Sequence, residues 1–218
     1  MIGSIAKKIF HRPTVQSIRV ITAPYYYNPN PLTVLLDFLP DAVRLHAGHV
    51  SVVAQILAKQ ARDMGEDFPH LVLLGGLYHH LGECPGFPRI KKQIPVMSEQ
   101  ALNKNMDALR AQAGSGADVV LDIARHHCER MDGSGYPDRL RGEQISLAAR
   151  LVGLADTLDS LLCGNLTSPN GSTDRAERFI SKSGIDLFGT DAITCFENER
   201  DMIYKLYLDY YQRMRGWA

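Results

Sequence analysis

The sequence predicts an all-α fold, a helical bundle preceded by a short irregular N-terminal arm. From about Leu32 onward, apolar residues recur at helical spacing, and no stretch shows the two-residue alternation of a β-strand. The length of 218 residues suits one domain with a substantial core rather than two full domains. We therefore assign residues 1–31 to the arm and residues 32–218 to the helical domain.

The arm is expected to be irregular because prolines punctuate it. Its start allows a short amphipathic helix, and the segment 23–31 that follows, APYYYNPNP, is rich in turn-forming residues. Proline has no backbone N–H to donate, so neither a helix nor a central strand is expected there.

The first helix of the bundle should present an inward stripe that includes a histidine. The stripe has helical spacing and consists of Leu45, His49, Val52, Val53 and Ile56. A second helix is expected over Pro69 to His80, before a turn rich in Gly and Pro. A third is expected to begin at Ser98, whose hydroxyl can cap it. The Gly114-Ser115-Gly116 break should end that helix.

The next helix brings two imidazoles to its apolar side. His126 and His127 each lie seven residues after a valine, so both prolong an apolar stripe. The helix should stop at DGSGYP, 132–137, which is a strong turn signal.

A long apolar helix face follows this turn and includes one carboxylate. The face is formed by Leu147, Leu151, Leu154, Leu158 and Leu161. Asp156 lies among these residues and needs a partner if it is buried. A polar loop, 164–174, then leads to a last stripe. That stripe, Ile203, Tyr207, Tyr210 and Met214, is interpreted as core, although a homodimer interface would show the same pattern.

Composition argues against several classes of function. Lys and Arg together number 24, and Asp and Glu together number 24, so the formal net charge is zero. The chain therefore has no overall positive charge that would attract nucleic acid polymers or an anionic membrane. No apolar run approaches the roughly 20 residues of a membrane span, and the start lacks the apolar core of a signal peptide. We expect a cytoplasmic protein. Its 4 cysteines form no CxxC pair and are interpreted as reduced thiols.

Histidines give the strongest chemical signal in the sequence. Of the 8 histidines, most occur in three short groups, which are His46 with His49, His79-His80 and His126-His127. We interpret His46 as a hydrogen-bonded structural residue, the commonest role of a lone histidine on an apolar face. The other grouped imidazoles, with Asp156, predict a metal-derived site, because these ligand types suit iron, manganese or zinc.

One segment resembles the signature of a known family. The run HHCERMDGSGYP at 126–137 is similar to HHExxDGxGYP, the signature of HD-GYP proteins, a branch of the HD phosphohydrolase superfamily. The resemblance covers roughly residues 40–200, including LYHHLGE at 77–83 and ARLVGLADTLD at 149–159. A bare DGxG would be ordinary turn chemistry, whereas its junction with a histidine pair is specific. The resemblance implies an HD-domain-like helical bundle.

The resemblance also implies roles for particular residues. Family members are bacterial signalling proteins that hydrolyse cyclic di-GMP at a bi- or trinuclear metal centre. The implied metal ligands, matched by position, are His49, His79, His126, His127 and Asp156. The implied partner or substrate loop, which in the family contacts GGDEF-type cyclase domains, consists of Asp132, Gly133, Gly135, Tyr136 and Pro137.

Several positions depart from the family pattern. His80 stands where the family has an aspartate that bridges two metals, and a neutral imidazole offers one lone pair only. Glu83 stands where the family has a lysine near the substrate phosphate, which reverses the charge. A further family histidine would fall near Asp107 or Ala108, and of these two residues only Asp107 could replace it. One ion is therefore expected rather than two or three, and none if the site is fully degenerate. Its expected ligands are His49, His79, His80 and Asp156, with His126 and His127 nearby.

Three functions stay open at this point. The first is a signalling domain with attenuated or lost hydrolysis that binds a metal, a cyclic dinucleotide or a protein partner. The second is an active cyclic di-GMP phosphodiesterase with an altered metal site, in which Glu83 is a base or an extra ligand. The third is a scaffold whose histidines are core residues.

Overall fold

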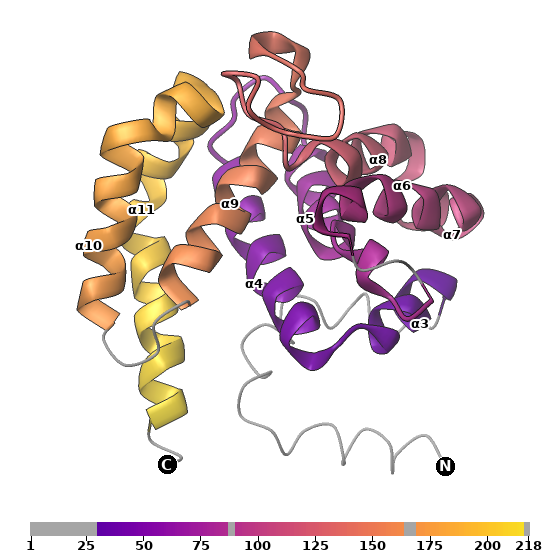
Figure 1. Cartoon of the computed structure of the whole chain (residues 1–218), viewed down its shortest axis with the longest axis horizontal. Coiled ribbons are helices and arrows are strands. Elements are labelled where there is room, and N and C mark those ends of the chain that lie inside the picture. Colours follow the sequence, from indigo (N-terminus) through magenta and orange to yellow (C-terminus); the bar gives the residue numbers. More distant parts are fainter. Residues whose placement is uncertain (1–29, 87–89, 164–168, 216–218) are drawn as a thin grey trace.

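The computed structural model describes residues 30–86, 90–163 and 169–215, and this part of the chain is helical without strands, as predicted (Figure 1). Its α-helices are α3 (Pro31–Phe38), α4 (Asp41–Ala58), α5 (Phe68–Tyr78), α6 (Ile94–Lys104), α7 (Met106–Ala113), α8 (Ala117–His126), α9 (Leu147–Cys163), α10 (Pro169–Phe179) and α11 (Ile185–Arg215). Most of the predicted arm lies outside the described residues. Its last two residues start α3, because Asn30 caps the helix and Pro31 is its first residue.

Two hydrophobic clusters form the core, and α5 contributes to both. One cluster joins α4, α5, α8 and α9 to α10 and α11, and the other joins α3, α6 and α7 to α5 and α8. Figure 1 shows α10 and α11 at one side of the bundle and α6 to α8 at the other, with α4 and α5 between them. All residues of α5 except Pro69 and His70 are buried. A helix that is apolar on every side belongs in the interior.

The predicted apolar stripes lie in this core. His49, Val52 and Val53 are buried on α4, and the leucine face of α9 packs in the same cluster. On α11, Ile203 and Tyr207 are almost fully buried, so this stripe is core within the chain. The side chain of Met214 lies outside the described residues.

Two expected boundaries differ from the structure. Ser98 lies inside α6, which begins at Ile94 with a proline in its first turn. The buried Ser98 hydroxyl instead donates to the carbonyl of His79 (2.7 Å) and accepts from the N–H of Gly82 (2.8 Å). It therefore holds the turn that follows α5. The expected polar loop 164–174 is also partly helical, because α10 begins at Pro169. Residues 164–168 lie outside the described residues.

The described helices include none that is long and apolar enough to cross a membrane. All four cysteines, Cys84, Cys128, Cys163 and Cys195, are free thiols.

Candidate metal centre

Potential metal ligands from three parts of the chain converge at one place in the bundle. His46 comes from α4, His79 and His80 from the turn after α5, and Asp156 from α9. One potential ligand atom of each lies within 4.8 Å of all the others. Two atoms bound at about 2.0–2.2 Å to one ion lie at most about 4.4 Å apart. Small side-chain rotations would therefore bring the four around a common ion.

His79 has the geometry of a metal-binding imidazole. Its side chain is fully buried, and Nδ1 lies 2.7 Å from the carbonyl oxygen of Gly76. Burial, followed by the charges of His80 and His127, lowers the pKa of His79, so the ring is neutral at pH 7. With Nδ1 donating, Nε2 carries a lone pair, and it has no hydrogen-bond partner among the described residues. Such a buried, unpaired nitrogen costs about 1–3 kcal/mol unless something binds it.

His46 lies between two carboxylates. Its Nδ1 is 2.6 Å from Asp159, and its Nε2 is 3.1 Å from Asp156. Burial alone would lower the pKa of His46, but hydrogen bonds to Asp156 and Asp159 outweigh it and raise the pKa to about 10. A carboxylate that holds the far nitrogen of a metal-binding histidine fixes its tautomer and orientation. Asp159 has this geometry relative to His46.

His80 and Glu83 pair with each other beside this group. The Nδ1 of His80 lies 2.9 Å from a carboxylate oxygen of Glu83, and both residues line the cavity described below. Burial lowers the pKa of His80, against the hydrogen bond to Glu83, which raises it. With the ring proton on Nδ1, the nitrogen that faces the Glu83 carboxylate, the lone pair of Nε2 is left for an ion. The structure therefore places Glu83 as the partner of His80, and its predicted role as a base stays a prediction.

His49 and His126 lie apart from the four-residue group. His49 forms a separate group with Asp159 and Cys163 and makes a 2.9 Å contact to Asp159 through Nδ1. His126 is held by two carboxylates, with Nδ1 2.6 Å from Asp122 and Nε2 3.0 Å from Asp138. Neither nitrogen of His126 is directed at the centre.

These placements change the expected ligand group at two positions. His46, interpreted from the sequence as a structural residue, lies in the group with His79, His80 and Asp156, whereas His49 lies in the separate group and its role as a ligand stays a prediction. At the end of α8, His127 stays near the centre, because its ring centroid is 4.9 Å from that of His79. His126 does not.

The residue after His127, Cys128, was missed as a candidate. Its thiol lies beside the imidazole of His127 and the hydroxyl of Tyr136. Aligning the family motif on its glutamate would have identified Cys128 as a candidate. HHExxDGxGYP has its histidines directly before the glutamate, and the two residues directly before Glu129 are His127 and Cys128.

Glu129 fixes the loop that closes this side of the site. It is 2% exposed, and its carboxylate accepts backbone hydrogen bonds from Asp138 (2.6 Å), Arg139 (3.0 Å) and Leu140 (3.1 Å). Each such charged bond contributes roughly 1.5–3 kcal/mol where water is excluded.

The predicted partner loop has an exposed side and a side that faces the cavity. Asp132 is exposed and accepts the N–H of Ser134 (2.8 Å), and Gly133 has a φ of 79°. A Cβ atom on Gly135 would lie 2.4 Å from the Cα of Glu129, so this position requires glycine. Tyr136 lines the cavity, and Pro137 follows it as a half-buried residue.

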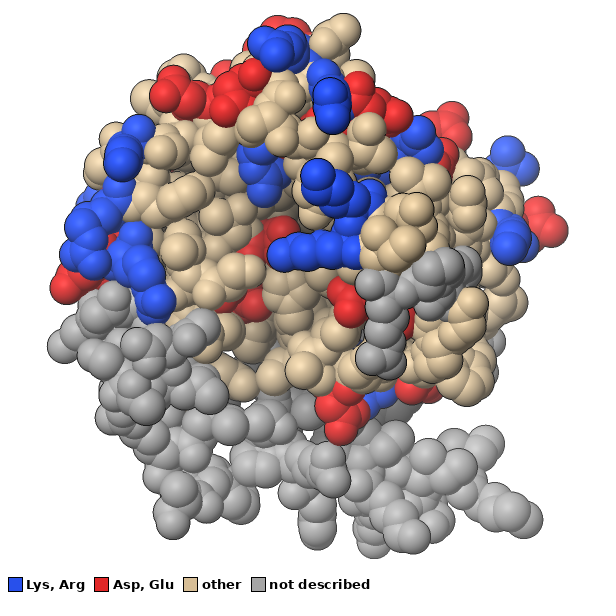
Figure 2. All heavy atoms as spheres, in the orientation of Figure 1, with Lys and Arg blue, Asp and Glu red and all other residues tan. Residues whose placement is uncertain are grey.

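A cavity of about 420 Å³ opens above the cluster. It lies within the range of roughly 300–1,000 Å³ that is usual for small-molecule sites. Figure 2 shows a hollow near the centre of this face, with Asp and Glu atoms inside it and Lys and Arg side chains at its rim. The lining residues that bear charge or metal-binding groups are His46, His80, Glu83, Lys91, His127, Cys128 and Asp156.

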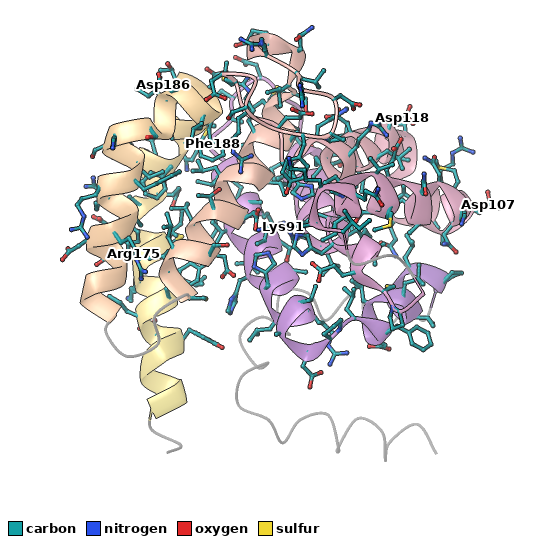
Figure 3. The ribbon with its side chains drawn as sticks, viewed as in Figure 1. Lys91, Asp107, Asp118, Arg175, Asp186 and Phe188 are labelled. Atoms are coloured by element: carbon teal, nitrogen blue, oxygen red, sulfur yellow. The ribbon has the colours of Figure 1, made fainter. Side chains whose placement is uncertain are left out.

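Two labelled side chains orient the site in Figure 3. Lys91 lies near the centre of the view, at the cavity, whereas Asp107 lies at the outer edge on α7. Asp107 is exposed and does not belong to the group of potential ligands. The buried lone pair of His79, with two more imidazoles and one carboxylate, fits a divalent transition metal.

Comparison with known proteins finds the HD domain and relatives that are named as cyclic di-GMP phosphodiesterases. The sequence profile of the HD domain matches residues 47–161. A cyclic di-GMP phosphodiesterase of Vibrio cholerae is 32% identical over 162 residues, which is 74% of this chain and 28% of that protein. The cyclic di-GMP phosphodiesterase response regulator RpfG of Xanthomonas campestris is 62% identical over 120 residues, 52% of this chain and 32% of RpfG.

A relative with a different named substrate also matches. The 3'3'-cGAMP-specific phosphodiesterase 1 of Vibrio cholerae is 30% identical over 121 residues, 53% of this chain and 28% of that protein. The chain thus spans between 28% and 32% of the length of these three relatives. The family match extends from α4 to α9. It therefore includes His79, His80 and Asp156 of the ligand group, and it begins one residue after His46. As its motifs predict, the chain belongs to the HD domain family.

Proposed function

We propose that this chain is an HD-GYP-type signalling domain of the cytoplasm that binds a divalent transition metal and a cyclic dinucleotide, with attenuated or lost hydrolysis. The observation that carries the proposal is the convergence of His46, His79, His80 and Asp156 beneath a cavity. Relatives named for cyclic di-GMP and 3'3'-cGAMP support a cyclic dinucleotide as the ligand class.

The proposed ion is iron, manganese or zinc, bound by one carboxylate and three imidazoles. When bound, such an ion polarises phosphoryl oxygens and lowers the pKa of a water molecule. The protein supplies the orientation of its ligands. His79 is fixed by Gly76 and Ser98, and His46 is fixed by Asp159.

The attenuation of hydrolysis is expected from two substitutions relative to the family, at His80 and Glu83. His80 provides one lone pair where the family aspartate bridges two ions, so a second ion loses a ligand. Glu83 adds a negative charge near the site of a phosphodiester. A centre reduced to one ion loses several kcal/mol of transition-state stabilisation, and each 1.36 kcal/mol is tenfold in rate.

Restoring the family residues tests this explanation. We expect no linear dinucleotide from cyclic di-GMP with the wild-type chain and iron, manganese, zinc or magnesium. The double variant His80→Asp, Glu83→Lys should turn over at least about a hundredfold faster than any wild-type background, because it regains a bridging carboxylate and a cation. Product is measured by liquid chromatography under anaerobic conditions.

A matched variant separates metal chemistry from contamination. His79→Ala, added to the double variant, should remove its turnover. If the wild-type chain itself forms linear product, and His79→Ala abolishes that product, the attenuated function is wrong and the active phosphodiesterase is correct.

Lys91 is the proposed contact for the phosphodiester groups. It is the one Lys or Arg among the described residues that line the cavity, and it has no ion-pair partner within the described part of the chain. Glu83, where the family has its lysine, is paired with His80. An unpaired cation at the cavity offers a charge-assisted hydrogen bond to a phosphate oxygen.

The neighbouring lysine provides the control for this prediction. Lys91→Ala should weaken cyclic di-GMP binding by about tenfold or more, the value of one charged hydrogen bond. Lys92→Ala, next in the same short helix but not in the cavity lining, should leave binding within about twofold. Isothermal titration of the metal-loaded chain measures both. Equal losses for the two variants would show that Lys91 acts through general charge alone.

A protein partner on the loop is the second candidate function. The exposed Asp132 favours contact with a GGDEF-type or other signalling protein. Tyr136 is turned to the cavity and favours a ligand there instead. Pull-down with purified cyclase domain, comparing wild type with Asp132→Ala, tests the protein interaction.

A further inference from the structure

Cys128 brings a thiol into the same cavity as the proposed metal ligands. Its side chain is half-buried and lines the cavity together with His127, His80 and Asp156. We propose that Cys128 and His127, which lie outside the group of His46, His79, His80 and Asp156, add a thiolate–imidazole pair to the ligands of the same ion. This inference rests on the proposed metal binding.

The backbone of Cys128 is held in place on both sides. His127 ends α8 as its C-cap, and the N–H of Glu129 donates to the carbonyl of His126 (2.8 Å). The carbonyl of Cys128 accepts from the N–H of Tyr136 (3.4 Å), and Gly135 packs directly against the same backbone. With its Cα fixed in this way, the thiol has a small choice of rotamers, and they lie in the cavity wall.

His127, whose ring interacts with the thiol of Cys128, provides a second sign of metal binding at this place. Its side chain is fully buried, and Nδ1 lies 3.2 Å from the carbonyl oxygens of both Ile123 and Ala124. The proton therefore sits on Nδ1, and the lone pair on Nε2 is directed elsewhere. Nε2 has no hydrogen-bond partner in the part of the chain that is described. A metal ion shared with the neighbouring thiolate would satisfy it.

Cys128 and His127 together would prefer particular metal ions. Thiolate and imidazole together suit zinc, iron and cobalt, whereas magnesium and manganese prefer oxygen ligands. On binding, the S–H bond breaks, the metal–sulfur bond forms and the proton leaves to solvent, so one proton is released for each ion bound through sulfur. The other three cysteines do not line this cavity. Cys84 and Cys195 are buried in the core, and Cys163 lies with His49 and Asp159.

Cobalt substitution tests the proposal through its spectrum. The metal-free full chain is titrated with Co²⁺ under anaerobic conditions. A thiolate ligand gives an intense sulfur-to-cobalt charge-transfer band in the near ultraviolet, in addition to the visible bands of bound Co²⁺. We expect the band in wild type and its loss in Cys128→Ser, with the visible bands retained. Cys163→Ser is the matched control and should keep the charge-transfer band.

A second measurement uses the reactivity of the thiol. Zn²⁺ should protect Cys128, but not Cys163, from iodoacetamide, as read by mass spectrometry of the peptides. Cys128→Ser should also weaken Zn²⁺ binding by at least the roughly tenfold that is lost when outer partners of metal ligands are removed, with little change for Mn²⁺. Thermal unfolding confirms that the serine variant is folded.

The outcomes separate this inference from the proposed function. Visible cobalt bands without a charge-transfer band in wild type would overturn the role of Cys128 and leave metal binding intact. A charge-transfer band that survives in Cys128→Ser and disappears in Cys163→Ser would assign the thiolate to the other group and overturn the proposal. No cobalt bands at all would overturn both the inference and the proposed metal binding.

Discussion

Replacing Asp156 by asparagine is expected to strip the chain of tightly bound metal. Asp156 is the one carboxylate in the described group of His46, His79, His80 and Asp156. Burial raises the pKa of this carboxyl, but the hydrogen bond from His46 and the charges of His79 and His127 outweigh it and lower the pKa well below its usual range. The group is therefore ionised at neutral pH. Asparagine keeps the shape and removes the charge, which leaves a divalent ion without a carboxylate ligand in this group.

The measurement is elemental analysis of chain purified without oxygen or chelator. Wild type should carry stoichiometric metal, and Asp156→Asn should carry close to none. Asp159→Asn is the control, because Asp159 holds His46 at Nδ1 (2.6 Å) and is not itself in that group. Loss of such an outer partner weakens metal binding by about 10–100-fold without eliminating it. Full metal content in Asp156→Asn would exclude this cluster as the metal site.

The helical fold and the segments of the site were predictable from the sequence. The stripe of α4, the leucine face of α9 and the HH and GYP motifs identify the stretches of chain that the structure brings together around one cavity. For the helices, periodicity is sufficient because it reports which face of a helix is buried. It reports nothing about what lies opposite that face.

Which histidine of each helix joins the candidate cluster was not predictable in the same way. His46 and His49 are three residues apart on α4, so both point inward, and periodicity treats them alike. The difference arises from α9, where Asp159 lies between them and accepts from both. His126 and His127 differ by about 100° around a helix, and the end of α8 decides which one faces the centre. Cys128 lies beyond the helix, where no period applies.

Replacing Gly153 by alanine is expected to reduce stability and metal binding together. Gly153 lies on α9, and a Cβ atom there would be 2.4 Å from the carbonyl oxygen of His127. That oxygen is backbone at the end of α8 and cannot rotate away. Helix α9 must therefore move, and overpacking of this kind costs about 1–3 kcal/mol of the free energy of unfolding, and sometimes more.

Urea unfolding of the metal-free chain measures this cost. Ser160→Ala, at an exposed position of the same helix, is the control and should change the free energy of unfolding by less than about 0.5 kcal/mol. Because α9 also carries Asp156, its displacement from His127 should widen the centre and lower metal content as well. A Gly153→Ala chain with wild-type stability would contradict the close approach of α9 to α8.

The two substitutions on α9 separate the framework of the centre from its ligands. Asp156→Asn removes a ligand and the charge that pairs with His46, so the metal-free chain should lose the stability that this buried pair contributes but keep the spacing of α8 and α9. Gly153→Ala keeps every ligand and moves the helix that carries one of them. If the centre depends on side-chain chemistry alone, Gly153→Ala would lose stability and keep its metal. Loss of both would show that the spacing between α8 and α9 is itself a requirement for metal binding.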